Sequence, residues 1–203
     1  PGRIRPVVSG VGTAVTGAAG LVAGAGAVTG SFSAVVPGVL PLSAVSVELD
    51  ALGGVFVAVT GGVAVAAGIY GISYGRGLAR GVHVVFPLFV VAMLLVPAAA
   101  GVTTFLVCWE LMALTSLLLV VAEHRERAEV ARAGRWYLGM THLGFVTVLI
   151  GLLVFAARAG GDSFDVLRQA SLSPATAGLV FVVTLAGFAS KAGILPLHAW
   201  LPR

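Results

Sequence analysis

Long apolar runs separated by short polar segments dominate the pattern of this chain. Runs of about 20 residues match the length that an α-helix needs to cross roughly 30 Å of hydrocarbon. We expect such helices over residues 7–30, 51–72, 82–99, 102–122 and 136–157, and from 175 past Lys191 to Pro196. The alternation typical of β-strands is absent, so the sequence predicts an all-α, polytopic transmembrane bundle of about six helices.

The connections refine this prediction. Residues 31–50 hold two prolines and end in acidic residues, which indicates an exposed connection with some extended structure. Almost no loop separates 82–99 from 102–122, so these two spans are expected to form a tight antiparallel pair. Residues 158–174 mix apolar side chains with charges, which favours a short amphipathic segment at the membrane interface.

Composition places the chain in a membrane. A mean hydropathy of +1.07 with 59% hydrophobic residues excludes an ordinary soluble domain. The net charge of +4 does not indicate a nucleic-acid partner, because the basic residues lie in short loops, where they report orientation. One side receives Arg3, Arg5, Arg76, Arg80, Arg125, Arg127, Arg132, Arg135 and Arg203, and the other receives Arg158 and Arg168. The richer side is expected to be cytoplasmic, which predicts a multi-pass protein of a bacterial-type inner membrane.

Motifs for catalysis are missing from the sequence. The single Cys108 cannot form an internal disulfide, and no Cys/His cluster has metal-ligand spacing. There is also no phosphate-binding loop and no nucleophile with a plausible base. We therefore expect no metal, no cofactor and no catalytic residue in this chain.

A carboxylate lies deep in one predicted span. Glu110 is about eight residues into 102–122, hence about 12 Å from the outer end of that helix. An uncompensated charge at this depth costs from about 3 to more than 10 kcal/mol, so such groups usually face a bundle interior. Glu110 is thus a candidate for ion transfer or ion pairing, and a neutral, protonated glutamate packed between helices is the alternative.

A lysine lies within the last predicted span. Gly187 and Gly193 flank Lys191, and Pro196 removes an amide from the following turn, which predicts a kink or break beside the ammonium and a hydrated cavity around it. Thr184 and His198 stand seven residues to either side. While the helix stays regular, these three side chains would form a polar track toward the cytoplasm.

Two histidines are candidate relays because imidazole titrates near physiological pH. His142 lies well inside 136–157, where it could relay protons or only bond a neighbouring helix. His198 could act as a relay or cap the end of its helix at the interface. A carboxylate stabilises a nearby ammonium, so a changing distance between Glu110 and Lys191 could drive directional proton transfer.

Two segments carry a family resemblance: CWELMALTSLLLV around Glu110 and GFASKAGILPLHAWLPR around Lys191, with LDALGG as a weaker match. With them, the chain resembles the antiporter-like membrane subunits of respiratory complex I, of Mrp-type sodium/proton antiporters and of membrane-bound hydrogenases such as formate hydrogenlyase. The ending WLPR, with Arg203, is more similar to the formate hydrogenlyase and hydrogenase-4 branch.

The resemblance implies an architecture of about fourteen helices that contains two inverted repeats. Residues 1–81 would be peripheral helices with an external loop at 31–50, and residues 82–203 an incomplete first repeat. The chain would then be a fragment of the N-terminal half. The resemblance also implies that Glu110 and Lys191 form the central pair, with His142 and His198 as relays.

The chain would then be a non-catalytic, proton-pumping subunit of an oxidoreductase or hydrogenase complex whose redox cofactors reside in partner subunits. Its expected partners are other membrane subunits, the lipid bilayer, and protons or Na⁺. Two alternatives stay open: a non-conducting scaffold that anchors a peripheral redox enzyme, and an Mrp-type Na⁺/H⁺ antiporter subunit.

Overall fold

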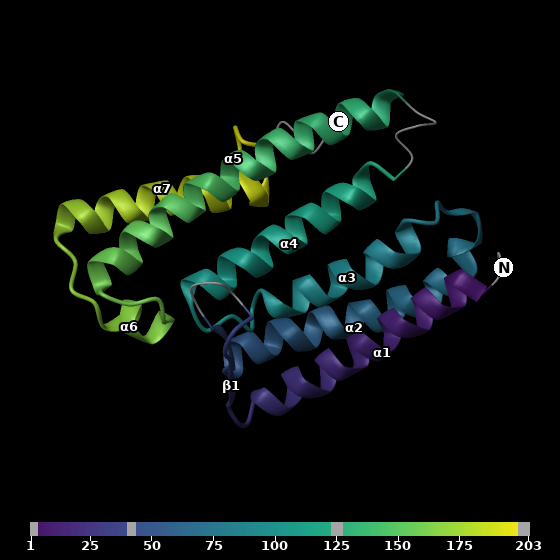
Figure 1. The fold of residues 1–203 in the computed structure, drawn as a ribbon, viewed down its shortest axis with the longest axis horizontal. Helices are drawn as coiled ribbons and strands as arrows, with labels where there is room; N and C mark the ends of the chain where they lie inside the picture. Colours follow the sequence, from purple (N-terminus) through teal and green to yellow (C-terminus); the bar gives the residue numbers. More distant parts are fainter. Residues whose placement is uncertain (1–3, 40–43, 123–127, 199–203) are drawn as a thin grey trace. The chain divides into compact units, whose positions relative to one another are not determined.

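The computed structural model describes residues 4–39, 44–122 and 128–198, and divides into two compact units, Pro1–Ala122 and Glu123–Arg203 (Figure 1). The first unit contains α1 (Ile4–Ala27), β1 (Phe32–Val36), β2 (Val45–Leu49), α2 (Ala51–Tyr74), the 3₁₀ turn η1 (Gly75–Gly77), α3 (Val82–Leu95) and α4 (Val102–Val120). The second contains α5 (Ala128–Ala159), α6 (Phe164–Gln169) and α7 (Pro174–Ala192). The prediction of an all-α membrane bundle is confirmed, with one small β-hairpin added.

Glycines bring α1 and α2 into close antiparallel contact along their length (Figure 1). Each helix has a glycine at every seventh position, and the two sets meet in antiparallel order. The pairs are Gly10 with Gly68, Gly17 with Gly61, and Gly24 with Gly54. A Cβ at Gly17 would lie 2.7 Å from the carbonyl oxygen of Gly61, so no side chain fits between the two backbones. This is the close approach that small residues permit between membrane helices.

Within the connection over residues 31–50, strands β1 and β2 pair antiparallel, with Phe32 opposite Leu49 at one end of the register and Val36 opposite Val45 at the other. Strand β2 also bonds the connection between α3 and α4: the amide of Glu48 donates to the carbonyl of Ala98 at 2.8 Å. The extended structure expected in this connection is therefore present, and its strand β2 holds the short turn that precedes α4.

The LDALGG segment joins the hairpin to α2. Asp50 caps the helix, its Oδ1 accepting from the amide of Gly53 at 2.7 Å, while Leu49 is buried with Ala27 and Ala98. A Cβ at Gly53 would lie 2.9 Å from the carbonyl oxygen of Pro97. The segment thus packs against the turn between α3 and α4, which explains why small residues follow the cap.

The predicted pairing of the third and fourth spans is confirmed, since α3 and α4 pack against each other. Helix α3 ends at Leu95 rather than at Ala99, because residues 98–100 bond β2 instead. Its 14 residues span about 21 Å, less than the hydrocarbon thickness. In the described part of the chain, five helices are long and apolar enough to cross a membrane: α1, α2, α4, α5 and α7.

The second unit consists of α5 and α7 packed along each other, with α6 between them in the chain (Figure 1). Helix α5 begins at Ala128, eight residues before the expected Trp136, so Arg132 and Arg135 lie on a helix rather than in a loop. The expected amphipathic segment is α6, whose Arg168 pairs with Asp165 at 2.6 Å.

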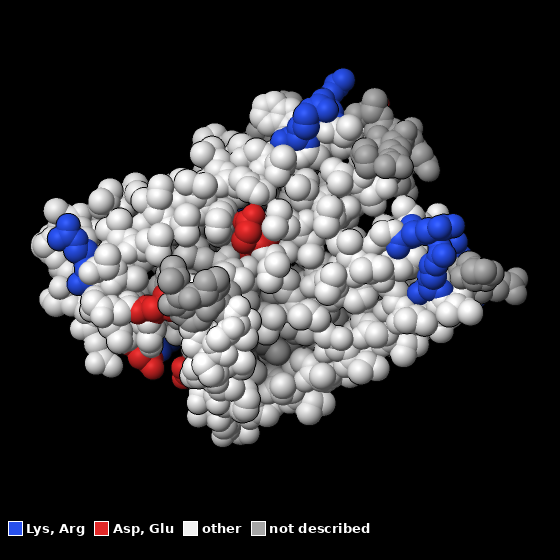
Figure 2. All heavy atoms as spheres, in the orientation of Figure 1, with Lys and Arg blue, Asp and Glu red and all other residues white. Residues whose placement is uncertain are grey.

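Large apolar side chains cover the outer faces of the helices. Val22, Phe56, Val63 and Phe181 are each more than half exposed. Figure 2 shows a surface that is mostly uncharged between small groups of charged side chains. Lipid tails can solvate such a surface and water cannot, which agrees with a multi-pass membrane protein.

Candidate functional site

Lys191 lies in the last turn of α7 and is half-buried. Its Nζ donates a hydrogen bond of 3.1 Å to the hydroxyl oxygen of Tyr137 on α5, and lies 5.3 Å from the centroid of that ring. The hydroxyl is therefore the nearer partner, rather than the ring face. Tyr137 itself is only 8% exposed. The sequence pattern gives no signal for this contact, because a tyrosine near the end of a span is usually an interfacial anchor.

Glycine contacts between α5 and α7 set the register that brings Lys191 to Tyr137. A Cβ at Gly187 would lie 2.6 Å from the carbonyl oxygen of Gly144 and 2.5 Å from Thr147 Oγ1. One turn on, the Ser190 hydroxyl donates to the carbonyl of Met140 at 3.3 Å. These contacts hold the two backbones close and fix which residue of α5 faces the lysine.

The helix break expected beside Lys191 is a glycine cap. Helix α7 ends at Ala192, and Gly193 adopts a left-handed conformation with φ of 70°. The amide of Ile194 donates to the carbonyl of Ala189 at 3.0 Å, and that of Gly193 donates to Ser190 at 3.3 Å. The expectation that the helix continues to Pro196 is therefore wrong. Because these carbonyls are already bonded, the break alone does not require a water-filled cavity.

The early end of α7 separates His198 from the predicted polar track. Thr184 and Lys191 share the helix, and the Thr184 hydroxyl donates to the carbonyl of Val180 at 2.7 Å within α7. His198 lies six residues beyond the last helical residue, so the seven-residue spacing no longer places it on their face. Its Nδ1 is buried and has no hydrogen-bond partner among the described residues.

His142 is half-buried on α5 and bonds its own helix. Its Nδ1 lies 3.0 Å from the carbonyl oxygen of Leu138, which is the geometry of a protonated Nδ1 donating to that carbonyl. In a neutral imidazole with this hydrogen bond, Nε2 carries the lone pair. His142 is five residues after Tyr137, or about 140° around the helix, so the two side chains leave α5 in different directions.

Glu110 is half-buried midway along α4, where the neighbouring Leu106, Cys108 and Ala113 are buried. Glu110 belongs to the first unit and Lys191 to the second, so the pairing of the two stays a prediction. Within the described ranges, no group of three or more His, Cys, Asp or Glu side chains could hold a metal ion.

Comparison with known proteins places this site in a family. Residues 99–203 match the model described as NADH:quinone oxidoreductase/Mrp antiporter, transmembrane. The match covers more than half of the chain and includes Glu110, His142, Lys191 and His198. The chain belongs to this family. The resemblance inferred from the sequence motifs is thereby confirmed.

Several relatives of this chain align over much of its length. An uncharacterised protein of Mycobacterium tuberculosis is 51% identical over 201 residues, which cover 98% of this chain and 31% of that protein. Hydrogenase-4 component B of Escherichia coli is 32% identical over 78% of this chain and 24% of its own length. NADH-quinone oxidoreductase subunit N of Thiobacillus denitrificans is 32% identical over 63% of this chain and 27% of its own length. The chain thus spans less than a third of these relatives.

Solved antiporter-like complexes share the fold. A chain of the Mrp complex from Dietzia superposes with a TM-score of 0.76 at 22% identity, covering 99% of this chain and 24% of that one. A chain of respiratory complex I from Thermus thermophilus superposes with a TM-score of 0.73 at 22% identity, covering 97% of this chain and 46% of that one. This chain therefore has the fold of an antiporter-like membrane subunit.

Proposed function

We propose that this chain is part of a proton-translocating subunit of a multi-subunit membrane complex, in which Glu110 and Lys191 carry the transferred charge. Its partners would be other membrane subunits that hold the redox cofactors. Within it, residues 1–81 would form the peripheral helices and residues 82–203 an incomplete first repeat. The single observation that best supports this function is the half-buried Lys191, whose ammonium bonds the hydroxyl of Tyr137 in the family-matched region.

A hydroxyl partner suits a lysine that gains and loses a proton. The ammonium donates to the phenol oxygen, and a neutral amine could instead accept from the phenol O–H. The hydrogen bond can therefore persist in both protonation states of Lys191, with only the direction of donation reversed. A carboxylate partner would favour the charged state alone.

The remaining candidates would pass protons to and from this lysine. Glu110 would be the acid that exchanges with Lys191, and approach or separation of the two charges would set the direction of transfer. His142 would accept a proton at Nε2, on a different face of α5 from the one that carries Tyr137. His198, with its buried Nδ1, would serve beyond the end of α7, and Thr184 would extend the polar path along α7.

The test is proton pumping by the complete complex in proteoliposomes, with Glu110→Gln and Lys191→Ala introduced separately. We expect each change to reduce pumping at least about tenfold with assembly retained, since each removes a titrating group within a span. Glu48→Gln, in β2, and Arg158→Ala, at the end of α5, are matched controls that should pump normally.

Normal pumping by both Glu110→Gln and Lys191→Ala would contradict the proposal and favour a non-conducting scaffold. Repeating the assay in sodium-free medium tests whether H⁺ or Na⁺ is the transported ion. A requirement for Na⁺ would favour the Mrp-type alternative over proton translocation alone.

A further inference from the structure

A groove of about 670 Å³ lies between α1 and the start of α3 in the first unit. Arg5, Arg80 and His83 line its polar part, and Val8, Val84 and Leu88 contribute an apolar wall. Farther along, α1 and α3 approach each other, since a Cβ at Gly20 would lie 2.8 Å from Leu94 Cδ2. The groove is therefore amphipathic, with cationic side chains near the beginning of both helices.

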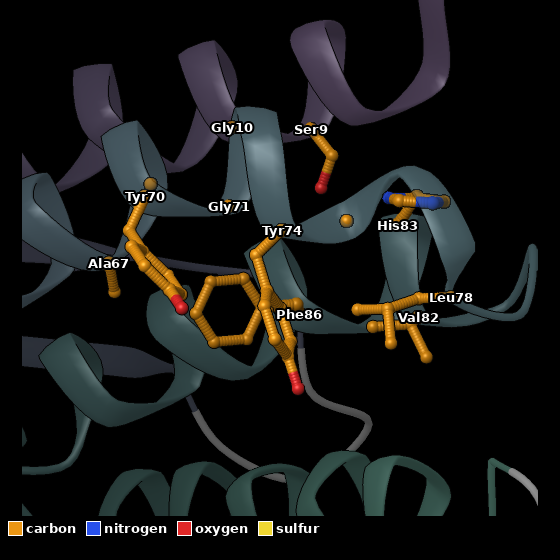
Figure 3. Close-up of a pocket in the computed structure, with 12 residues that line it drawn as sticks. Ser9, Gly10, Ala67, Tyr70, Gly71, Tyr74, Leu78, Val82, His83 and Phe86 are labelled. Carbon is orange, nitrogen blue, oxygen red and sulfur yellow. The ribbon is translucent and has the colours of Figure 1, made fainter. Parts of the chain in front are cut away.

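His83 and Ser9 separate this groove from a second pocket of about 280 Å³, because both residues line the two cavities. Figure 3 shows this second pocket, where the rings of Tyr70, Tyr74 and Phe86 gather and His83 lies to one side. Aromatic rings line much of the second pocket, whereas two arginines line the first. The first is the better candidate for a ligand.

Among the described residues, no carboxylate lies beside the arginines at this end of the first unit. Arg5 and Arg80 are exposed, and neither pairs with a carboxylate among the described residues. The carboxylates Glu48 and Asp50 lie at the opposite end of α2, whose 24 residues span about 36 Å. Figure 2 shows the blue side chains gathered on the first unit near the N-terminal end of α1.

We propose that this groove binds one anionic phospholipid of the surrounding bilayer. The headgroup phosphate would accept hydrogen bonds from the guanidinium groups of Arg5 and Arg80, which suit phosphate oxygens. One acyl chain would lie along Val8, Val84 and Leu88. Basic pockets between membrane helices on the cytoplasmic side bind such headgroups, and this end of the unit is the one predicted to be cytoplasmic.

The role of the two arginines is tested by measuring lipid binding to the full-length protein in its complex. Native mass spectrometry in mild detergent would compare phosphatidylglycerol with phosphatidylcholine of the same acyl chains. We expect Arg5→Gln and Arg80→Gln each to weaken phosphatidylglycerol binding roughly fivefold without affecting phosphatidylcholine. Arg76→Gln is the matched control, because Arg76 lies at the same end but does not line the groove. Equal binding by all three variants and the wild type would overturn the proposal.

The apolar part is tested by filling the groove. A Cβ at Gly12 would meet nothing within 4 Å, so Gly12→Phe should occupy the groove without disturbing α1. Gly26→Phe is its control on the same helix, since Gly26 is equally open and does not line the groove. We expect only Gly12→Phe to lose the bound lipid. Displacement of the lipid by inorganic phosphate, or cross-linking of a photoreactive residue at position 12 to polypeptide rather than to lipid, would overturn the proposal.

Discussion

At the scale of single residues, the central observation is that Lys191 bonds a neutral hydroxyl. A hydrogen bond from an ammonium contributes about 1.5–3 kcal/mol, enough to hold the lysine side chain in one position. Because Tyr137 is almost fully buried, little water can replace its hydroxyl. We therefore predict that Tyr137 positions Lys191, and that its effect appears in proton transfer rather than in folding.

Tyr137→Phe tests this role, because it removes the hydroxyl and keeps the ring. We expect proton pumping to fall about tenfold while the complex assembles normally, as one charged hydrogen bond is lost. The measurement is the pumping rate in proteoliposomes across a range of pH. A merely structural role of Tyr137 would leave the shape of this pH profile unchanged. Tyr70→Phe, on the exposed face of α2, is the control and should have no effect.

At the scale of helices, glycines decide which residues meet. Gly187 lies against Gly144, and Gly17 lies against Gly61, so the pairs α5 with α7 and α1 with α2 are both built on backbone contact. Between membrane helices, the stabilisation comes from this close packing and not from expelling water. A larger side chain at such a position must push two helices apart.

Gly187→Leu should therefore separate α7 from α5. We expect the complex to lose about 1–3 kcal/mol of stability from overpacking, and the hydrogen bond between Lys191 and Tyr137 to be lost with it. Thermal unfolding in detergent measures the first effect and proton pumping the second. Gly178→Leu is the control on the same helix, because a Cβ there meets nothing within 4 Å. Equal stability of the two variants would show that the contact contributes little.

At the scale of the whole molecule, charge distribution predicts orientation. The first unit has Arg76 and Arg80 at one end and the β1–β2 hairpin at the other, with apolar helices between. Because basic residues favour the cytoplasmic side, the hairpin should face outward. This arrangement also determines which leaflet of the bilayer supplies a lipid to the groove between α1 and α3.

Cysteine accessibility in intact cells tests the orientation. After Cys108→Ala, a cysteine introduced at Val35 in β1 should react with a membrane-impermeant thiol reagent added outside, since Val35 is exposed. A cysteine at Arg76 should react only after the membrane is permeabilised. The reverse pattern would contradict the orientation and place the basic groove in the outer leaflet.

The sequence by itself determined the membrane class, the approximate spans and the family. These follow from the length of the apolar runs and from local motifs around Glu110 and Lys191, which are properties of continuous segments. Helix ends were harder to predict. The sequence did not decide whether the break near Lys191 lay at Gly193 or farther along, and it predicted that the helix ending at Leu95 would continue to Ala99. Only the tertiary structure decided the end of α3, the pairing of β2 with the turn before α4, and the contact of Lys191 with Tyr137. The partners in that contact are 54 positions apart in the chain, and they meet because the register of two glycine-packed helices aligns them.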